Sequence, residues 1–251
     1  MTSDDLAGRV ALVTGATGTL GEAVCRALAG RGAVVVGAFH RAEHRADELV
    51  AWHEREGYVL RTVAADLTDP DARSTMLERV REIAGPPDIV VCSHGITQRR
   101  SLLDKPAPDG SLWALNVDAS IALVSAAAKG MLRRRFGRLV LVGSRAGMVG
   151  MPGQAAYAAT KAALQGWAAS AAWELGPFGI TVNVVAPGAV QADPDRESVY
   201  SKDEDELVAS RTAVRRLGTP AEIAATVAFL TSPLAGYVSG QTIAVDGGAR
   251  W

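Results

Sequence analysis

Short apolar runs alternate with longer stretches of helical period along the whole chain. The apolar runs are rich in β-branched residues and are apolar on both faces, so they predict strands buried inside a sheet. The stretches between them are rich in alanine and leucine, and their period predicts helices. We expect strands at residues 10–14, 33–39, 59–64, 89–92, 138–143, 181–186 and 241–245 and helices at residues 20–31, 42–56, 71–84, 110–135, 157–175 and 221–231.

The order of these elements predicts a single α/β domain over residues 1–251. Strand–helix alternation indicates successive βαβ units, which form a doubly wound parallel sheet with helices on both faces. A polar, charge-rich interruption at residues 191–216 lies between the sixth strand and the last helix. A long insertion at such a place is typical of a lid over a ligand site.

The net charge and the cysteines limit which binding partners and which cellular compartment we expect. The formal net charge is −1, so the chain has no global field to hold nucleic acid or an anionic membrane. Cys25 and Cys92 lie far apart in apolar segments, which suits a reducing compartment. The acidic first residues do not resemble a signal peptide, and no apolar run approaches the ~18–20 residues of a membrane span. We therefore expect a cytoplasmic protein without a nucleic-acid, membrane or metal site.

A glycine-rich segment directly follows the first strand and opens the first helix. Glycines there permit a tight turn and a close approach of the backbone, and the helix N-terminus directs its N–H groups at an anion. Such a run also serves ordinary turns, but its position in a βαβ chain favours a dinucleotide site. The expected contacts are Gly15, Thr17, Gly18, Thr19, Leu20 and Gly21.

The end of the second strand bears on the choice of cofactor. An acid at this position would bind the adenosine ribose hydroxyls, but the strand ends in Phe39, His40 and Arg41. Arg41, helped by His40, would instead bind a 2′-phosphate, which predicts NADP(H). The alternative is that Arg41 is a solvated residue at the start of a helix. Asp66, followed by Leu67, would meet the adenine or cap the next turn.

Asn116, Ser144, Tyr157 and Lys161 are the candidate catalytic residues. Tyr157 and Lys161 are four residues apart, so on a helix they share a face, and an ammonium beside a phenol lowers the phenol pKa. A tyrosine tuned in this way can exchange a proton with a carbonyl oxygen. Ser144 ends the fifth strand, where its hydroxyl can hold that oxygen. The pair would also fit an exposed helical face, but the surrounding segment is small and apolar.

From about Gly8 to Gly248 the sequence resembles the short-chain dehydrogenase/reductase family. The resemblance rests on the glycine-rich turn, Asn116, Ser144 thirteen residues before Tyr157, Lys161, Pro187-Gly188 and Val245-Asp246-Gly247-Gly248.

The resemblance implies a Rossmann fold and an oxidoreductase. It implies that Tyr157 is the acid/base, that Ser144 orients the substrate and that Lys161 tunes Tyr157 and holds the nicotinamide ribose. Asn116 would position a water in the proton relay. Further cofactor contacts are expected at Ser93, Gly95, Pro187, Gly188 and Val190. A homodimer or homotetramer is also implied.

The sequence departs from the usual family pattern in three places. Thr19 stands where this branch usually has its middle glycine, a spacing similar to that of polyketide ketoreductases. Cys92-Ser93-His94-Gly95 replaces the usual Asn-Asn-Ala-Gly. For His94 we favour a packing role over a catalytic one. After Pro187-Gly188, Ala192 replaces the threonine that commonly contacts the carboxamide. None of these changes removes the proton-transfer residues.

The segments around Gln154 and Arg216-Leu217-Gly218 look most like 3-oxoacyl-carrier-protein reductases, which predicts a β-ketoacyl substrate in contact with Gln154. Arg135, in the cluster Arg133-Arg134-Arg135 with Arg138 nearby, would steer an acidic acyl carrier protein to the cleft mouth. Alternatively, these cations simply favour a helix C-terminus. Phe178 stands where a second basic docking residue would be expected.

Two further functions remain open at this point. A small-molecule alcohol dehydrogenase or ketone reductase would use the same four residues under a different lid. A non-catalytic NADP(H)-binding regulator would have no need of Ser144, Tyr157 and Lys161 in register.

Overall fold

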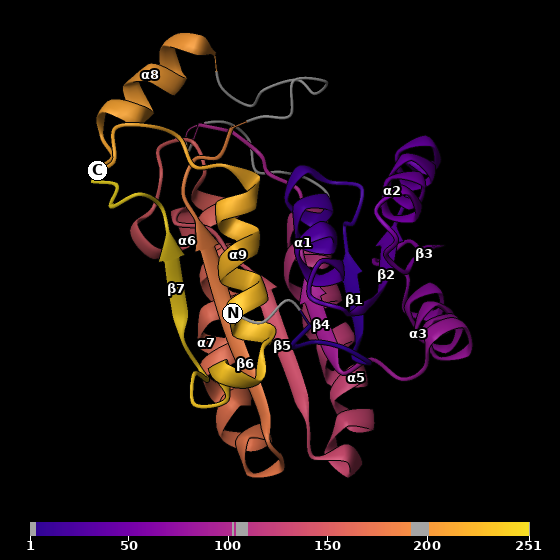
Figure 1. The fold of residues 1–251 in the computed structure, drawn as a ribbon. Coiled ribbons are helices and arrows are strands. Elements are labelled where there is room, and N and C mark those ends of the chain that lie inside the picture. The colour runs from indigo at the N-terminus through magenta and orange to yellow at the C-terminus, as the bar shows by residue number, and fades with distance from the viewer. Residues whose placement is uncertain (1–3, 102, 104–109, 192–200, 251) are drawn as a thin grey trace.

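The computed structural model describes residues 4–101, 103, 110–191 and 201–250. Seven parallel strands form one sheet in the order β3-β2-β1-β4-β5-β6-β7. This confirms the predicted doubly wound α/β fold (Figure 1). The strands are β1 Val10–Thr14, β2 Val34–Phe39, β3 Leu60–Ala64, β4 Ile89–Cys92, β5 Gly137–Val142, β6 Ile180–Pro187 and β7 Thr242–Val245.

Helices cover both faces of the sheet and enclose two apolar cores. One core joins the sheet to α3, α5 and α7, and the other joins it to α1, α2 and α9. The helices are α1 Thr19–Ala29, α2 Glu43–Arg55, α3 Pro70–Ala84, α4 Ser111–Trp113, the π-helical η1 Ala114–Ala119, α5 Ser120–Arg134, α6 Ala146–Val149, α7 Ala155–Leu175, η2 Gly176–Phe178, α8 Lys202–Ser210, α9 Pro220–Thr231 and η3 Pro233–Ala235.

The predicted strands and helices are present. The observed and predicted elements differ where the local pattern of apolar residues is weak. Two strands, β1 and β4, have the predicted bounds, and the others shift by a residue or two at their ends. The predicted helix at residues 110–135 is interrupted by the π-helical segment η1. The short helix α6 was not predicted, because one helical turn shows no period. Helix α8 was not predicted either, since it lies inside the polar insertion.

The helix formed by α4, η1 and α5 corrects one expectation about membrane spans. Over Ser111–Arg134 it is long and apolar enough to cross a membrane by length and composition, the one such helix among the described residues. Half of its apolar window is buried inside the fold. Leu123, Val124 and Met131 are fully buried in the core on the sheet. Its hydropathy therefore reflects packing against the sheet.

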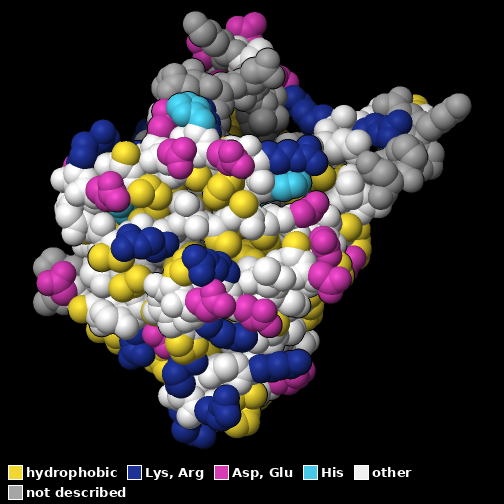
Figure 2. All heavy atoms as spheres, turned by 90° about the vertical axis from the view of Figure 1, so that its right-hand side faces the viewer, with side chains coloured by type: hydrophobic (Ala, Val, Ile, Leu, Met, Phe, Trp, Pro, Cys, Tyr) yellow, Lys and Arg dark blue, Asp and Glu magenta, His cyan; other side chains and the backbone are white. Residues whose placement is uncertain are grey.

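The surface over the β3 side of the sheet mixes both signs of charge. Figure 2 shows Lys and Arg side chains interspersed with Asp and Glu side chains on this face, with apolar patches between them. Some of these charges pair at helical spacing, as in Arg79 with Glu82 at 2.9 Å. Such exposed pairs contribute about 0–1 kcal/mol each.

His94 joins the end of β1 to the start of α5. Its Nδ1 lies 2.6 Å from Thr14 Oγ1, and its Nε2 lies 3.1 Å from Ser120 Oγ. Ser120 Oγ donates its own proton to the carbonyl of Asn116, so Nε2–H donates to Ser120 and Nδ1 is the acceptor that faces Thr14. The Thr14 hydroxyl also lies 3.4 Å from the Val91 carbonyl, so its one proton is shared between these two acceptors. Burial lowers the His94 pKa to about 3, with a smaller contribution from the charge of Lys161. The ring is therefore a neutral brace inside the fold, which agrees with a packing role.

This brace predicts that stability depends on pH in the acid range. The folded-state pKa of His94 lies below its unfolded value, so its contribution is fully present above about pH 6.5 and is lost as the pH falls toward 3. His94→Asn should flatten the loss of unfolding free energy over this range by up to about 1.4 kcal/mol per pH unit. Urea unfolding at a series of pH values measures that slope. His44→Gln, at a side chain that is 82% exposed, is the control and should leave the slope unchanged. Equal slopes in all three proteins would contradict the neutral-brace assignment.

Candidate active site

The first part of the site is the turn between β1 and α1. A side-chain carbon at Gly21 would lie 2.1 Å from the carbonyl oxygen of Gly15, so only glycine fits there. Gly18 begins the helix without a side-chain cap. This arrangement leaves the N-terminus of α1 directed at the cleft, which suits the binding of a phosphate.

Two adjoining cavities form one cleft along the carboxyl edge of the sheet. The volumes are about 1000 Å³ and about 290 Å³, and Ser93, His94, Gly95 and Ile96 line both. The predicted cofactor residues in the larger cavity are Gly15, Thr17, Gly18, His40, Arg41, Asp66 and Leu67. Those in the smaller one are Leu20, Tyr157, Lys161, Pro187, Gly188 and Val190. Thr19 instead lines a groove between α1 and α9, and Gly21 packs against Gly15.

The cleft contains a buried polar atom without a partner. Ser93 lines both cavities, and its Oγ is buried without a hydrogen-bond partner among the described residues. A buried hydroxyl without a partner costs free energy unless a ligand or water satisfies it. The volume of the cleft, the open end of α1 and Ser93 together fit a dinucleotide.

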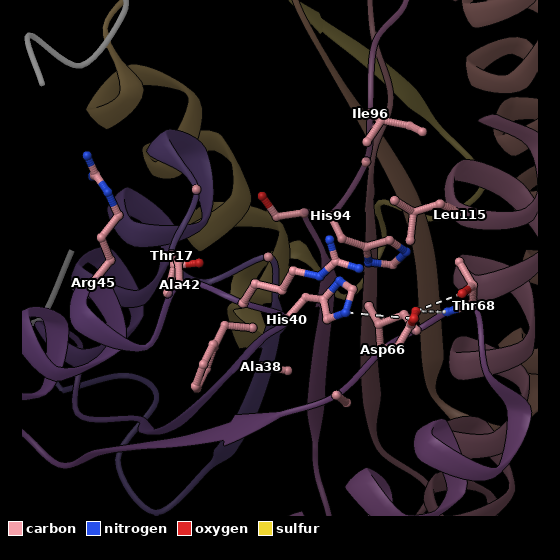
Figure 3. A pocket seen from close by; sticks show the side chains of 18 of the residues that line it. Thr17, Ala38, His40, Ala42, Arg45, Asp66, Thr68, His94, Ile96 and Leu115 are labelled. Carbon is pink, nitrogen blue, oxygen red and sulfur yellow. Dashed lines mark hydrogen bonds and ion pairs between the residues drawn. The ribbon is translucent and has the colours of Figure 1, made fainter. Parts of the chain in front are cut away.

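At the end of β2, His40 points toward Asp66 across the larger cavity (Figure 3). His40 Nε2 lies 3.7 Å from Asp66 Oδ2, and both side chains are close to half exposed. Asp66 Oδ1 accepts hydrogen bonds from the backbone N–H and the hydroxyl of Thr68. These bonds, followed by His40 and Arg41, lower the Asp66 pKa. Asp66 therefore caps the turn at Thr68, which was one of its two expected roles, and it also lines the larger cavity.

Arg45 is a cavity residue that the sequence pattern did not single out. It lies one helical turn after Arg41, on the far side of the cavity from Asp66 (Figure 3). Both arginines lie at the N-terminal end of α2, whose first residue follows Ala42 without a side-chain cap. Cations at a helix N-terminus oppose the helix dipole. That unfavourable placement is the signal that could have identified Arg45 as part of an anion site.

Ser144 and Tyr157 meet at the smaller cavity because α6 packs closely on α7. Ser144 follows β5, and Tyr157 lies in the first turn of α7. A side-chain carbon at Gly147 would lie 2.7 Å from the backbone nitrogen of Ala162, so this approach requires glycine. Ser144 Oγ accepts a 3.1 Å hydrogen bond from the backbone N–H of Ala146. The hydroxyl proton of Ser144 is then oriented to donate to a ligand.

Lys161 is 4% exposed and lies beneath Tyr157. Its Nζ donates a 2.9 Å hydrogen bond to the carbonyl of Val142 and lies 5.9 Å from the centre of the Tyr157 ring. Burial lowers the Lys161 pKa to about 8, while neighbouring Cys92 acts in the opposite direction. Below that pH the ammonium places a positive charge beside the phenol, an arrangement that favours phenolate.

Asn116 lies in the π-helical segment η1 and braces the loop after β4. Its amide nitrogen donates to the Ile96 carbonyl at 2.9 Å and to Thr160 Oγ1 at 3.1 Å. Its amide oxygen accepts from the backbone N–H of Ile96 at 2.9 Å. Isolated π-helical turns are often found at functional sites. No residue pattern marks this one, and the role of Asn116 toward a water stays a prediction.

Gln154 borders the predicted reaction centre. It directly precedes α7 and is 5% exposed. It lines a cavity of about 170 Å³ together with Ser144, Tyr157 and Pro187. The predicted substrate residue therefore lies beside the two groups that would bind the reacting oxygen.

The arginine cluster lies at the amino end of β5, away from the mouth of the cleft in the same chain. Arg135 ends α5 before β5 begins, whereas Ser144 follows β5, so about 20 Å of strand separates them. Arg134 pairs with Asp88 at 3.3 Å, and Arg135 donates to the Pro177 carbonyl. Arg138 is 5% exposed and bonds backbone carbonyls, so it is a buried structural cation. These contacts attach the cluster to the segments around the C-terminal end of α5.

Residues 192–200 of the predicted lid lie outside the described residues. The described part contains α8, which begins with a capping box formed by Ser201 and Glu204. Glu204 Oε1 also accepts a 3.0 Å hydrogen bond from Arg99, on the loop that follows β4. This ion pair joins α8 to the loop that Asn116 braces.

Comparison with known proteins agrees with this geometry. A family model described as enoyl-(acyl carrier protein) reductase matches residues 15–250. The chain is 37% identical to the 3-oxoacyl-[acyl-carrier-protein] reductase FabG of Escherichia coli (strain K12) over 242 residues, which are 96% of this chain and 97% of that protein. It is 36% identical to the protein of the same name from Vibrio cholerae, over 97% of this chain and 98% of that protein.

Solved structures share the fold over nearly the whole chain. A provisionally named gluconate dehydrogenase from Agrobacterium tumefaciens matches with a TM-score of 0.93 at 29% identity, over 99% of this chain and 98% of that one. A provisionally named betaketoacyl-ACP reductase matches with a TM-score of 0.85 at 36% identity, over 97% and 98%. The family model and these relatives show that the chain belongs to the short-chain dehydrogenase/reductase family.

Proposed function

We propose that this protein is an NADPH-dependent ketoreductase that reduces a 3-oxoacyl thioester to the 3-hydroxyacyl thioester on an acyl carrier protein. The observation that carries the proposal is the meeting of Ser144, Tyr157 and Lys161 in a cavity continuous with a larger one of dinucleotide size. Its relatives named as 3-oxoacyl-[acyl-carrier-protein] reductases support the substrate class.

The residues at the smaller cavity divide the work of carbonyl reduction. NADPH, when bound, supplies the hydride that the carbonyl carbon receives. Tyr157 donates its phenolic proton to the carbonyl oxygen. The C=O double bond becomes a C–O single bond as the new C–H and O–H bonds form. Ser144, whose oxygen is held by the Ala146 N–H, donates a hydrogen bond to the same oxygen. Lys161 stabilises the tyrosinate that remains until it is reprotonated from solvent.

The positive groups at the end of β2 support NADPH over NADH. Arg41 and Arg45 line the larger cavity with His40, at the uncapped N-terminal end of α2. A 2′-phosphate bound there would accept hydrogen bonds from the helix N-terminus and from the two guanidinium groups. The carboxylate of Asp66 is already engaged by Thr68.

A second candidate function is reduction of a small polar ketone, or oxidation of the corresponding alcohol. The structure named as a gluconate dehydrogenase has the higher of the two TM-scores, although its sequence identity is lower. The pocket beside Tyr157 also carries polar side chains, including Thr97, Arg145 and Gln154. Carrier docking at Arg135 and formation of a homodimer or homotetramer stay predictions.

A substrate panel separates these functions. NADPH oxidation by the wild-type protein should be faster with a 3-oxoacyl chain on an acyl carrier protein than with the same chain on N-acetylcysteamine or with a keto sugar acid. Turnover restricted to the keto sugar acid would instead favour the second candidate. Tight NADPH binding without turnover of any of the three would reject both and favour a regulator.

Tyr157→Phe tests the proton donor. Removing the phenolic proton should lower kcat by about 10²–10⁴-fold. The dissociation constant for NADPH should change little, since the ring remains in place. Steady-state rates and NADPH fluorescence titration measure the two quantities. Tyr58→Phe, at a half-exposed tyrosine on the surface, is the control and should behave like wild type. A Tyr157→Phe protein with wild-type kcat would remove Tyr157 from the mechanism.

Arg41→Ala tests the phosphate assignment. Loss of a charged hydrogen bond to the 2′-phosphate should weaken NADPH binding by roughly 10–100-fold, whereas NADH binding should be nearly unchanged. Arg45→Ala should act in the same direction. Arg55→Ala, at the exposed C-terminal end of the same helix, should affect neither cofactor. Equal losses for NADPH and NADH in the Arg41 variant would place the 2′-phosphate elsewhere.

A further inference from the structure

Arg145, the residue after Ser144, bonds three separate segments of the chain. Its backbone N–H donates a 2.9 Å hydrogen bond to the carbonyl of Pro187. Its guanidinium pairs with the carboxylate of Asp246 and donates to the carbonyl of Ala249. The Arg145 side chain is 16% exposed and that of Asp246 is 8% exposed. The arginine thus ties the loop of Ser144 to the end of β6 and to the segment after β7.

The segment that Arg145 binds after β7 is itself bonded to the stretch that follows α8. Ala213 and Val214 donate to the carbonyls of Gly248 and Gly247, and Arg250 donates to the carbonyl of Arg211. Asp246 also accepts a 2.9 Å bond from the Gly248 N–H, which holds its carboxylate in place. A continuous set of bonds therefore runs from Arg145 to the described part of the predicted lid.

Arg145 also belongs to the turn that holds the Ser144 hydroxyl. Arg145 precedes α6, and its carbonyl accepts hydrogen bonds from Met148 and Val149 in that one-turn helix. Ser144 Oγ is in turn oriented by Ala146, the first residue of the helix. Arg145 and Ser144 are therefore joined to the same one-turn helix by short-range hydrogen bonds. Misplacement of a catalytic group by about 1 Å can reduce a rate by about 10²-fold.

We propose that Arg145 is a positioning residue that clamps the segment 246–249 against the catalytic loop and thereby sets the position of Ser144. The residue acts through Ser144, and it also lines the cavity beside Tyr157. The guanidinium pairs with a buried carboxylate through Nη1, whereas its Nε is buried without a hydrogen-bond partner among the described residues. The kinetic part of this inference rests on the proposed reductase function, whereas the clamp itself does not.

The test compares Arg145→Met with a matched variant elsewhere in the fold. Arg31 has the same type of environment, because it pairs with the carboxylate of Asp5 and donates to the Ala228 carbonyl. Those two side chains are 10% and 14% exposed, close to the values for Arg145 and Asp246. Arg31 follows the C-terminal end of α1, at the opposite edge of the sheet from Ser144. Arg31→Met therefore controls for the loss of one buried ion pair.

Rates are measured per molecule able to bind NADPH, at a temperature below both unfolding transitions. Arg145→Met should lower kcat for a 3-oxoacyl thioester by about 10–100-fold, with less than about a threefold change in NADPH dissociation constant. Arg145→Lys should recover part of the rate, since it keeps the charge but not both bonds. Arg31→Met should lower the melting temperature alone. A wild-type kcat for Arg145→Met, or an equal loss of kcat in both variants, would overturn the positioning role.

Hydrogen exchange of the free protein tests the clamp without any substrate. Arg145→Met should speed amide exchange in both residues 144–149 and residues 246–250, whereas Arg31→Met should leave both segments as in wild type. Unchanged exchange in residues 144–149 of Arg145→Met would reject the clamp. If the wild-type protein reduces no carbonyl, the proposed function fails, and the exchange result still decides the clamp.

Discussion

The parallel pairing of β4, β5 and β6 is the constraint on which the rest of this structure depends. Strands paired in the same direction end at the same edge, so the segments that follow them converge. Gly95, Ser144 and Pro187 come from these three ends and line one cavity, although the chain between them is long. Helix α7 then supplies Tyr157 and Lys161 from the face of the sheet. The candidate catalytic residues gather at this edge because parallel pairing brings the carboxyl ends of the three strands together.

That edge also contains polar groups that burial would make costly without partners. Lys161 is satisfied by the Val142 carbonyl, His94 by Thr14 and Ser120, and Arg145 by Asp246. Each of these contacts joins a strand end to another segment, so satisfying a buried polar group also sets the position of a loop. Two atoms of this set are buried without a hydrogen-bond partner among the described residues, the Ser93 hydroxyl oxygen and Arg145 Nε. Ser93 is also one of the residues that line the cleft, so a ligand bound there is positioned to satisfy its hydroxyl after a small movement.

The sequence by itself determined the sheet, the phosphate turn and the four candidate catalytic residues. Buried parallel strands are apolar on both faces, and this local signal located all seven of them. The glycines of the first turn are required by contacts within a few residues, as the approach of Gly21 to Gly15 shows. Tyr157 and Lys161 share a helical face by spacing alone. These features depend on neighbours in the chain, which a residue pattern records directly.

Contacts between distant segments could be seen in the tertiary structure but not in the sequence pattern. The tertiary structure buries Arg138, separates Arg135 from the cleft and brings Arg45 to the cavity wall. It also introduces the π-helical turn at Asn116 and pairs Arg145 with Asp246, 101 residues away. A charged residue has the same local pattern whether it is solvated, buried or paired. Which of these it becomes depends on the partners that packing brings to it, and those partners lie outside any local window of sequence.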